Sequence, residues 1–356
     1  MRIAFYLNSI SPHQLPLARE VATFLGEDNV LYIFQFDVPE GRLKCGWMNI
    51  RERAGIRLSH IDADDSREWL ENSNVVYSGV RDFALFARRA SKGLQTFYAS
   101  ERWFKPIQLG RWLLPGFLRL ISPSYLKMLI SFSRWRHYDL KAKCLAIGPK
   151  AAQDFRLIGV HRSNIVPWGY YVDTDIAASA EQSQNQQVPG KLRILWVGRM
   201  VALKRVDTLI KALKLLVNNQ VSSPFEYSLT LVGDGPELCR LQRLAEGLPV
   251  SFLPFQPLDV VRGIMRNHDI FVFPSNGLEG WGAVVNEALS EGMVVLGAAA
   301  PGACLSLLPK GRLFRVGDYR HLAKLLSVEC KPEGLPEQWT PSGAAMTLVK
   351  LAEEVV

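Results

Sequence analysis

Cysteine is scarce in this chain of 356 residues, and no pair among its five cysteines has the spacing of a zinc or redox motif. Long apolar runs are also missing, since none reaches the roughly 18 residues that a membrane-spanning helix needs. The chain begins with a strand-like run, residues 3–7, rather than with a basic region, an apolar stretch and a cleavage site. We therefore expect a cytoplasmic protein that does not span a membrane.

Acidic residues are almost absent from one long segment. Between Arg102 and Lys143, nine basic residues stand against one acidic residue, Asp139, and nine minus one equals the net charge of +8 of the whole chain. The basic residues of this basic aromatic region (102–143) are Arg102, Lys105, Arg111, Arg119, Lys127, Arg134, Arg136, Lys141 and Lys143. The same region carries Trp103, Phe104, Trp112, Leu113, Leu114, Phe117, Tyr125, Phe132, Trp135 and Tyr138.

Two interpretations of this region stay open. Basic and aromatic residues together suit an anionic membrane surface, because aromatic rings sit at the headgroup level and Lys and Arg meet lipid phosphate. This predicts a peripheral protein on the cytoplasmic face of the inner membrane. Alternatively, an amphipathic helix that begins near Ser122-Pro123 has a solvated basic face carrying Lys127, Arg134 and Lys141. No nucleic-acid recognition motif accompanies the charge, so we expect no nucleic-acid partner.

The length and the order of predicted elements indicate two α/β domains with mostly parallel sheets. The strands expected in the first domain are 3–7, 30–34, 56–61, 75–78, 96–99, 144–148 and 165–167, and those in the second are 192–197, 228–232, 250–253, 270–274, 293–296 and 312–316. We place the domains at 1–173 and 191–335, with a polar linker at 174–190. Residues 336–356 are expected to form a helix that packs back toward the first domain. Ligands of such sheets bind outside the carboxyl ends of the strands, so we expect a cleft between the domains.

The most informative segment runs from Glu279 to Glu287, with glycines at positions 280 and 282. It follows an apolar strand and leads into a helix, and the N–H groups at a helix N-terminus suit phosphate. The two carboxylates cannot hold phosphate, so they are better suited to accept hydrogen bonds from neutral hydroxyls on either side of it. A sugar and a ribose that flank a diphosphate fit this pattern.

Four landmarks in the second half together resemble the GT-B retaining glycosyltransferases of family 4. They are Val197-Gly198-Arg199-Met200 followed by Lys204, then 231–237 (LVGDGPE), then 270–275 (IFVFPS), and then the Glu279-x7-Glu287 segment. The second landmark is also a plain strand-to-helix turn. The resemblance implies two Rossmann-like domains and transfer of a sugar from a nucleotide-diphosphate sugar, with UDP more expected than GDP. The sequence around Glu279 is similar to that of bacterial enzymes that build O-antigen, capsule or exopolysaccharide. This resemblance suggests a glycan or lipid-linked acceptor.

The resemblance also assigns roles. Arg199 and Lys204 would clamp the diphosphate, where negative charge develops as the sugar leaves, and Glu279 would hold sugar hydroxyls. These three are the predicted catalytic residues. Glu287 would hold the ribose, and the nucleobase would lie near Phe255. The remaining predicted donor contacts come from the backbone, at Gly198, Gly280, Trp281, Gly282, Ala283 and Val284. No cofactor or metal is expected, because the cations and amides can stabilise the leaving group.

The first half departs from the family pattern. Many relatives have a glycine-rich loop after the first strand, whereas residues 8–16 contain no glycine. His13 and Gln14 fall there and are possible acceptor or sugar contacts. A family histidine that contacts the donor sugar has no counterpart, and Glu101 stands in its place, either as a sugar-hydroxyl partner or as a partner of Arg102.

Three alternatives accompany the prediction of a glycosyltransferase. Asp62-Ala63-Asp64 matches the metal-binding Asp-x-Asp of another glycosyltransferase fold, but residues 64–68 are also typical of a capped helix start. A nucleotide-sugar epimerase of related fold would use the same donor residues without an acceptor. A non-catalytic partner that binds or scaffolds another enzyme would not need Arg199, Lys204, Glu279 and Glu287 together.

Overall fold

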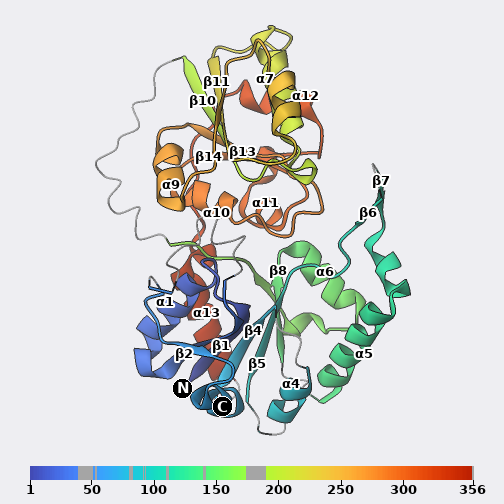
Figure 1. Ribbon diagram of the computed structural model, residues 1–356, viewed down its shortest axis with the longest axis vertical. Coiled ribbons are helices and arrows are strands. Elements are labelled where there is room, and N and C mark those ends of the chain that lie inside the picture. The colour runs from blue at the N-terminus through green and yellow to red at the C-terminus, as the bar shows by residue number, and fades with distance from the viewer. Residues whose placement is uncertain are drawn as a thin grey trace. The chain divides into compact units, whose positions relative to one another are not determined.

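The computed structural model describes residues 1–38, 51–52, 54–79, 83–90, 92, 94–109, 112–138, 142–173 and 190–354 (Figure 1). The chain divides into two compact units, Met1–Val172 with Glu337–Val356, and Asp173–Pro336. The expected linker lies outside the described residues except for its last residue, Gly190. Within the described part of the chain, no helix is long and apolar enough to cross a membrane.

Unit 1 is built on a sheet of seven parallel strands in the order β3-β2-β1-β4-β5-β8-β9. The strands are β1 (Ile3–Ser9), β2 (Val30–Phe36), β3 (Leu58–His60), β4 (Asn74–Ser78), β5 (Thr96–Ser100), β8 (Lys143–Ile147) and β9 (Ile165–Trp168). All seven predicted strands are therefore confirmed. An antiparallel pair, β6 (Ile107–Leu109) and β7 (Trp112–Leu114), was not predicted.

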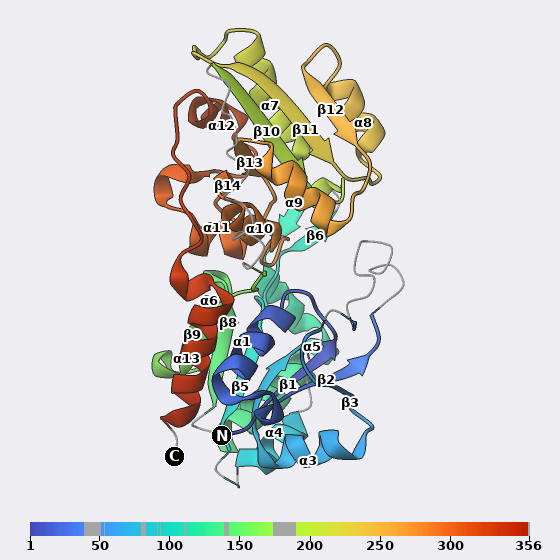
Figure 2. The same ribbon diagram turned by 90° about the vertical axis from the view of Figure 1, so that its left-hand side faces the viewer.

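Helices cover this sheet on both faces. They are α1 (Leu15–Leu25), α3 (Asp64–Asn72), α4 (Phe83–Ala90), α5 (Pro123–Tyr138), α6 (Pro149–Leu157) and α13 (Pro341–Glu353). The C-terminal helix α13 packs against α1, near the opposite end of the sequence, and the two lie side by side in Figures 1 and 2. The last helix therefore completes unit 1, although the chain reaches it only after unit 2.

Unit 2 contains six parallel strands in the order β12-β11-β10-β13-β14-β15. They are β10 (Lys191–Val197), β11 (Glu226–Val232), β12 (Val250–Leu253), β13 (Ile270–Phe273), β14 (Val294–Ala298) and β15 (Leu313–Phe314). The helices are α7 (Val206–Val217), α8 (Leu238–Leu244), α9 (Leu258–Arg266), α10 (Val284–Ser290), α11 (Gly302–Leu307) and α12 (Tyr319–Leu326). The predicted second series is confirmed, although the strand expected at 312–316 is shorter.

The strands could be recognised because the sheets are buried on both faces. Five consecutive residues of β1, Ile3 to Leu7, are buried, and all of β13 is buried. Parallel strands covered by helices on both sides have near-continuous apolar sequences of this kind. Among the described residues, one apolar core lies in unit 1 and another in unit 2.

Several rings of the basic aromatic region belong to the core of unit 1. Trp103 and Phe104 are each 8% exposed, while Phe132 and Trp135 are each 1% exposed. Phe132 lies against Trp103 with ring centroids 4.8 Å apart. The expectation that aromatic rings of this region meet lipid headgroups is therefore wrong for these four residues, because all four belong to the buried core of unit 1.

The strand order identifies one functional edge in each sheet. In unit 2 the chain proceeds from β10 outward through β11 and β12, then returns to the other side of β10 with β13. In unit 1 the same reversal separates β1 from β4. Ligands of open parallel sheets bind at the carboxyl ends of the two strands that flank such a reversal. The two predicted motif loops, after β10 and after β13, follow these two strands of unit 2.

Candidate functional site

The loop after β10 carries Arg199 and Lys204 to the switch point of unit 2. The N–H of Lys204 donates to the Val201 carbonyl at 2.9 Å and closes a short turn. The N–H of Asn276, in the loop after β13, donates to the Leu203 carbonyl at 2.9 Å. The backbone therefore joins the two motif loops next to Lys204, while the Arg199 side chain is exposed.

Lys204 and Glu279 form a direct ion pair across these two loops. The Lys204 Nζ lies 2.7 Å from the Glu279 Oε2, and both side chains are less than one-fifth exposed. The same Nζ lies 5.2 Å from the centroid of the Phe273 ring, at the end of β13, which adds a cation–π contact. Two of the three predicted catalytic side chains are thus brought together although they are 75 positions apart in the sequence.

The Gly233-Asp234-Gly235-Pro236 turn supports the loop of Arg199 through its backbone. The N–H of Met200 donates to the Asp234 carbonyl at 2.7 Å, and the Met200 carbonyl accepts from the N–H of Glu237 at 3.0 Å. A Cβ at Gly233, where φ is +130°, would lie 2.0 Å from the Gly198 carbonyl oxygen. This landmark therefore needs glycine for close packing, in agreement with its interpretation as a structural turn.

The segment between Glu279 and α10 is fixed by the next helix. The carbonyls of Gly280 and Trp281 accept hydrogen bonds from Gly302 and Ala303 at the start of α11, at 2.9 and 3.1 Å. The Trp281 side chain is 1% exposed. Its indole N–H donates to the Asn286 Oδ1 at 2.8 Å. Trp281 is therefore an anchor, and it offers a ligand only its backbone.

Gly282 is the position where a side chain is least tolerated in this segment. Its φ is +96°, and a Cβ there would approach the Phe273 ring to 2.6 Å. Ala283 and Val284 follow at the start of α10. The Val285 N–H donates to the Gly282 carbonyl at 3.0 Å. The first N–H groups of a helix have no acceptor within the helix, and in α10 this first turn follows the loop after β13.

Glu287 is buried in α10 and lies apart from the ion pair. Its side chain is almost completely covered, and burial raises the pKa of its carboxyl to about 7, while Arg262 opposes the shift and Glu291 adds to it. Glu291 is held by Arg262 at 3.6 Å and Arg266 at 2.7 Å. These three supporting residues were not predicted, because charged residues on helices give no sign in the sequence that they will be buried.

Phe255, a predicted contact of the donor nucleotide, lies away from the β10 and β13 loops in the strand order. It follows β12, which is separated from β10 by β11, and it is 45% exposed. A flat exposed ring at the same sheet edge suits stacking with a base. Its assignment to the nucleobase stays a prediction.

In unit 1, His13 and Glu101 are connected through Tyr170, which the sequence did not single out. The His13 ring is stacked against Tyr170 with centroids 5.9 Å apart. The Tyr170 hydroxyl donates to the Glu101 Oε1 at 3.0 Å, and the Lys105 Nζ lies 2.5 Å from the Glu101 Oε2. Glu101 therefore has Tyr170 and Lys105 as partners. Gln14, by contrast, is 3% exposed, and its side chain is covered by protein.

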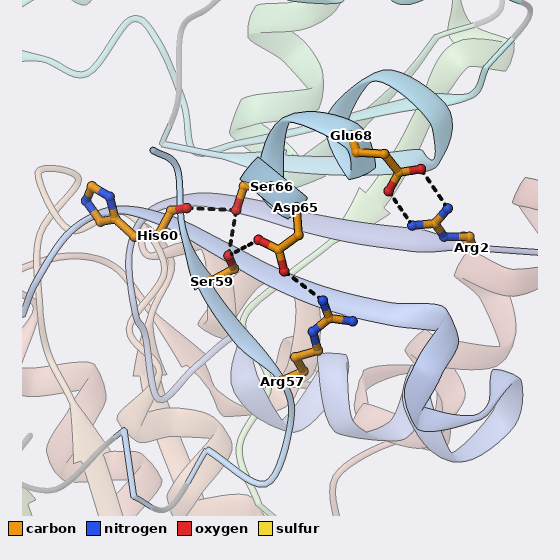
Figure 3. Close-up of polar contacts among 7 residues, drawn as sticks. All are labelled: Arg2, Arg57, Ser59, His60, Asp65, Ser66 and Glu68. Atoms are coloured by element: carbon orange, nitrogen blue, oxygen red, sulfur yellow. Dashed lines mark hydrogen bonds and ion pairs between the residues drawn. The ribbon is translucent and has the colours of Figure 1, made fainter. Parts of the chain in front are cut away.

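The acidic residues at the start of α3 take part in local structure, as Figure 3 shows. Asp65 accepts from the Ser59 hydroxyl at 2.8 Å and from Arg57 at 2.7 Å. Asp62 lies 3.3 Å from the His60 ring. Helix α3 does begin at Asp64, but the residue before it, Ala63, gives no side-chain cap. Among the described residues, no group of three or more His, Cys, Asp and Glu side chains is placed to hold a metal ion.

Comparison with solved structures identifies the fold. Solved structures similar over the whole chain include the lipopolysaccharide outer core galactosyltransferase WaaB, with a TM-score of 0.67 at 16% identity and full coverage of both chains. Another is Anabaena HepE in complex with UDP, with a TM-score of 0.62 at 16% identity, covering 100% of this chain and 98% of that one. Together with the two parallel sheets, they identify a GT-B fold.

Sequence comparison finds similarity to glycosyl transferases over part of the chain. Residues 191–327, most of unit 2, match the family model described as Glycosyl transferases group 1. The chain is 29% identical to the sulfoquinovosyl transferase SQD2 of Arabidopsis thaliana over 186 residues, which are 49% of this chain and 32% of that protein. It is also 29% identical over 145 residues to a GDP-mannose-dependent phosphatidylinositol dimannoside mannosyltransferase of Mycobacterium tuberculosis, covering 40% of this chain and 37% of that protein. The chain therefore spans only about a third of the length of these two relatives.

Proposed function

We propose that this protein is a metal-independent retaining glycosyltransferase that uses a nucleotide-diphosphate sugar, with UDP as the nucleotide. The observation that carries the proposal is the Lys204–Glu279 ion pair at the switch point of unit 2. It places a cation for the diphosphate beside a carboxylate for the sugar. A site for a sugar diphosphate needs both kinds of group within hydrogen-bonding distance of the ligand.

The leaving diphosphate is held by Arg199, Lys204 and the backbone around Gly282. Negative charge grows on the phosphate oxygens as the bond to the sugar breaks, and fixed cations and N–H dipoles stabilise that charge. Arg199 offers a forked guanidinium, whereas Lys204 offers a compact charge. A backbone hydrogen bond joins the β10 and β13 loops, and the ion pair holds Lys204 close to Glu279. This arrangement can replace a metal ion.

The two glutamates bind hydroxyls on either side of the diphosphate. Glu279 lies next to Lys204 and accepts from the sugar, while Glu287, further along α10, accepts from the ribose. In the mechanism that we propose, the acceptor hydroxyl attacks from the same face that the phosphate leaves, and the departing oxygen takes the proton. No side-chain nucleophile is required, and the configuration of the sugar is retained.

The acceptor in this proposal is a lipid-linked glycan of a bacterial surface polysaccharide, at the cytoplasmic face of the inner membrane. His13 and Glu101 are the unit 1 residues proposed to contact the sugar or the acceptor. The stacked pair of His13 and Tyr170 offers a flat face to a sugar ring, and Glu101 accepts from its hydroxyls. Two of the compared proteins, named for lipopolysaccharide and for a phosphatidylinositol mannoside, act on lipid-bearing glycans.

The test is a transfer assay with radiolabelled donors in the presence of a chelator. UDP-glucose, UDP-galactose, UDP-N-acetylglucosamine and GDP-mannose are each incubated with the protein and a bacterial lipid extract. We expect label from one UDP-sugar in the lipid fraction, with the α linkage of the donor preserved, and loss of label with Lys204→Met. Conversion of the donor without an acceptor would indicate an epimerase instead. No conversion and no binding of any donor would indicate a non-catalytic protein.

A further inference from the structure

Helix α5 and the turn before it expose an apolar surface that the core of unit 1 does not use. The turn η3 (Gly116–Ile121) and α5 carry five large apolar side chains that are exposed by 40% to 79%: Phe117, Leu120, Ile121, Leu126 and Ile130. Isolated exposed apolar residues are ordinary, but a group of them marks a surface with a binding partner. Helix α5 lies at the outer edge of unit 1, with β6 and β7 beyond it (Figure 1).

Helix α5 has two different faces. Phe132 and Trp135 point into the core. Leu126 and Ile130, one turn apart, lie on the exposed side. Lys127 and Arg134, two turns apart, are exposed on the flank of this stripe. The exposed face therefore has an apolar centre and a cationic border, whereas a merely solvated face would be polar throughout.

The charge around this face has one sign. From Arg102 to Tyr138 the sequence contains seven basic residues and no acidic one. An acidic neighbour would neutralise the border or repel an anionic surface, and none is present in the sequence of this stretch. A protein partner with an acidic groove would meet the cations, but it would have to bury η3 and α5 together along their length. A lipid headgroup layer meets both requirements, since it is anionic at its surface and apolar below.

We propose that the η3–α5 face, defined by Phe117, Leu120, Ile121, Leu126, Lys127, Ile130 and Arg134, docks unit 1 on an anionic lipid bilayer. The aliphatic side chains and Phe117 enter the headgroup boundary, and Lys127 and Arg134 contact lipid phosphate. The inference deepens the proposed function, because a lipid-linked acceptor is presented at such a surface. The sequence alone favoured the tryptophans of this region as membrane contacts. The structure buries Trp103 and Trp135, so exposed aliphatic side chains take this role in the proposal.

The test is sedimentation of the full chain with vesicles. Vesicles of phosphatidylcholine and phosphatidylglycerol are compared with vesicles of phosphatidylcholine alone. We expect the wild type to bind the anionic vesicles, more weakly as salt rises. Lys127→Gln/Arg134→Gln should lower the partition coefficient about 30-fold, since each cation near an anionic leaflet contributes a factor of roughly five. Ile121→Ser/Leu126→Ser/Ile130→Ser should lower it at least about tenfold, because less apolar area is buried.

Matched controls come from the same unit. Arg156 and Arg162 are exposed and basic, and Leu157 is 76% exposed, but all three lie away from η3 and α5 in the chain. Arg156→Gln/Arg162→Gln and Leu157→Ser should bind vesicles as the wild type does. All variants are first required to keep the wild-type melting temperature.

Two results would overturn the docking face: wild type that does not bind anionic vesicles, and face variants that bind no worse than the controls. A concentration-dependent dimer that the triple serine variant abolishes, without vesicle binding, would also overturn it. The proposed function is judged separately, by transfer to a short-chain, water-soluble acceptor. If both face variants retain transfer to the soluble acceptor but no longer bind vesicles, both proposals stand. If transfer is absent while vesicles bind, only the function fails.

Discussion

The contact between Lys204 and Glu279 joins two residues that have opposite tasks in the proposed reaction. Lys204 must attract phosphate, yet part of its charge is balanced by Glu279 at 2.7 Å. An ion pair at such a position holds both side chains in place. It also weakens the attraction of Lys204 for an anion, because the nearby carboxylate offsets part of the positive charge. Because the Phe273 ring lies close to the same ammonium group, Lys204 is held from two sides.

We predict that Glu279→Gln separates sugar binding from diphosphate binding. Affinity for free UDP should be unchanged or higher, because Lys204 is no longer neutralised. The extra affinity of the UDP-sugar over UDP should fall about 10-fold to 100-fold, as expected for the loss of hydrogen bonds to a charged group. Calorimetric titration with UDP and with the UDP-sugar that the wild type turns over measures both quantities. Glu246→Gln, at an exposed position of the same unit, is the control, and equal losses for both ligands would argue against a sugar contact.

Glu287 gives a pH-dependent prediction. Its pKa is raised by burial from 4.5 to about 7, so the folded state holds a proton that the unfolded state releases between these values. The stability due to the neutral carboxyl is present below pH 4.5 and is lost as pH rises through about 7. Glu287→Gln stays neutral and should be more stable than the wild type at pH 8, by on the order of 3 kcal/mol, with little difference at pH 4.5.

Melting curves of Glu287→Gln and wild type at several pH values measure this difference. Glu329→Gln, at an exposed position, should show no such trend. The same substitution should weaken UDP binding at pH 8, because an amide has one acceptor oxygen where the carboxylate has two. A stability difference that does not change with pH would contradict the buried, neutral carboxyl.

At the scale of elements, the loop of Arg199 depends on a second turn that touches no ligand. Gly233 and Gly235 let the β11–α8 turn approach the β10 loop so closely that a Cβ would collide with its backbone. The supporting bonds run from Met200 to Asp234 and from Glu237 to Met200. Glycine at these sites therefore allows the close packing that supports the Arg199 loop.

We predict that Gly233→Ala lowers both stability and UDP affinity. The added Cβ would lie 2.0 Å from the Gly198 carbonyl oxygen, so the Arg199 loop must move. A loss of about 3 kcal/mol in stability, and of at least about tenfold in UDP affinity, is expected from strain of this size. Gly247→Ala is the matched control. It also has positive φ, +74°, but nothing lies near its Cβ, and it should cost about 1 kcal/mol without affecting UDP. Equal behaviour of the two variants would contradict a supporting role for the turn.

Much of the site's chemistry was predictable, but little of its support was. Glu279 and Lys204 follow buried strands, and polar residues after such strands are conspicuous in the sequence. The residues that support the segment after Glu279 are less visible, since Gly302 bonds to Gly280 through its backbone and Asn286 accepts one bond from the buried Trp281 indole. Tyr170 lies 69 positions from Glu101 and reaches it only because both follow strands of the same sheet.

The strands were predicted from apolar runs, and both sheets followed from them. The β6–β7 pair was missed because each strand has only three residues and no strong turn signal. For the aromatic residues of α5 the sequence left two interpretations open, a membrane surface and an amphipathic helix with a solvated basic face. Burial decided against a membrane surface for Phe132 and Trp135, since an amphipathic helix places its largest rings toward the sheet.

At the scale of the whole molecule, two cores form separately within one chain. Unit 1 takes its last helix from the C-terminus, and Ala344, Ala345 and Leu348 of α13 are buried there. The chain leaves unit 1 and returns to it after building unit 2. The stability of unit 1 therefore depends on a helix that follows unit 2 in the sequence.

We predict that Leu348→Ala loosens unit 1 alone. Leu348 is fully buried, and removal of a buried leucine typically costs 2 to 5 kcal/mol. Hydrogen exchange followed by mass spectrometry should show faster exchange in α1 and α13, with α7 and α10 unchanged. Met346→Ala, at a position that is 46% exposed, is the control. Equal acceleration in both units would contradict separate cores.

The most direct test of the account is calorimetric titration of UDP with metal ions chelated. We expect the wild type to bind UDP under these conditions, because Arg199, Lys204 and backbone amides hold the diphosphate. Lys204→Met should weaken binding about 10-fold to 100-fold, the range for hydrogen bonds to a charged group, while Lys214→Met on the exposed side of α7 should not. Absence of UDP binding, or equal affinity in the two variants, would contradict the proposed donor site.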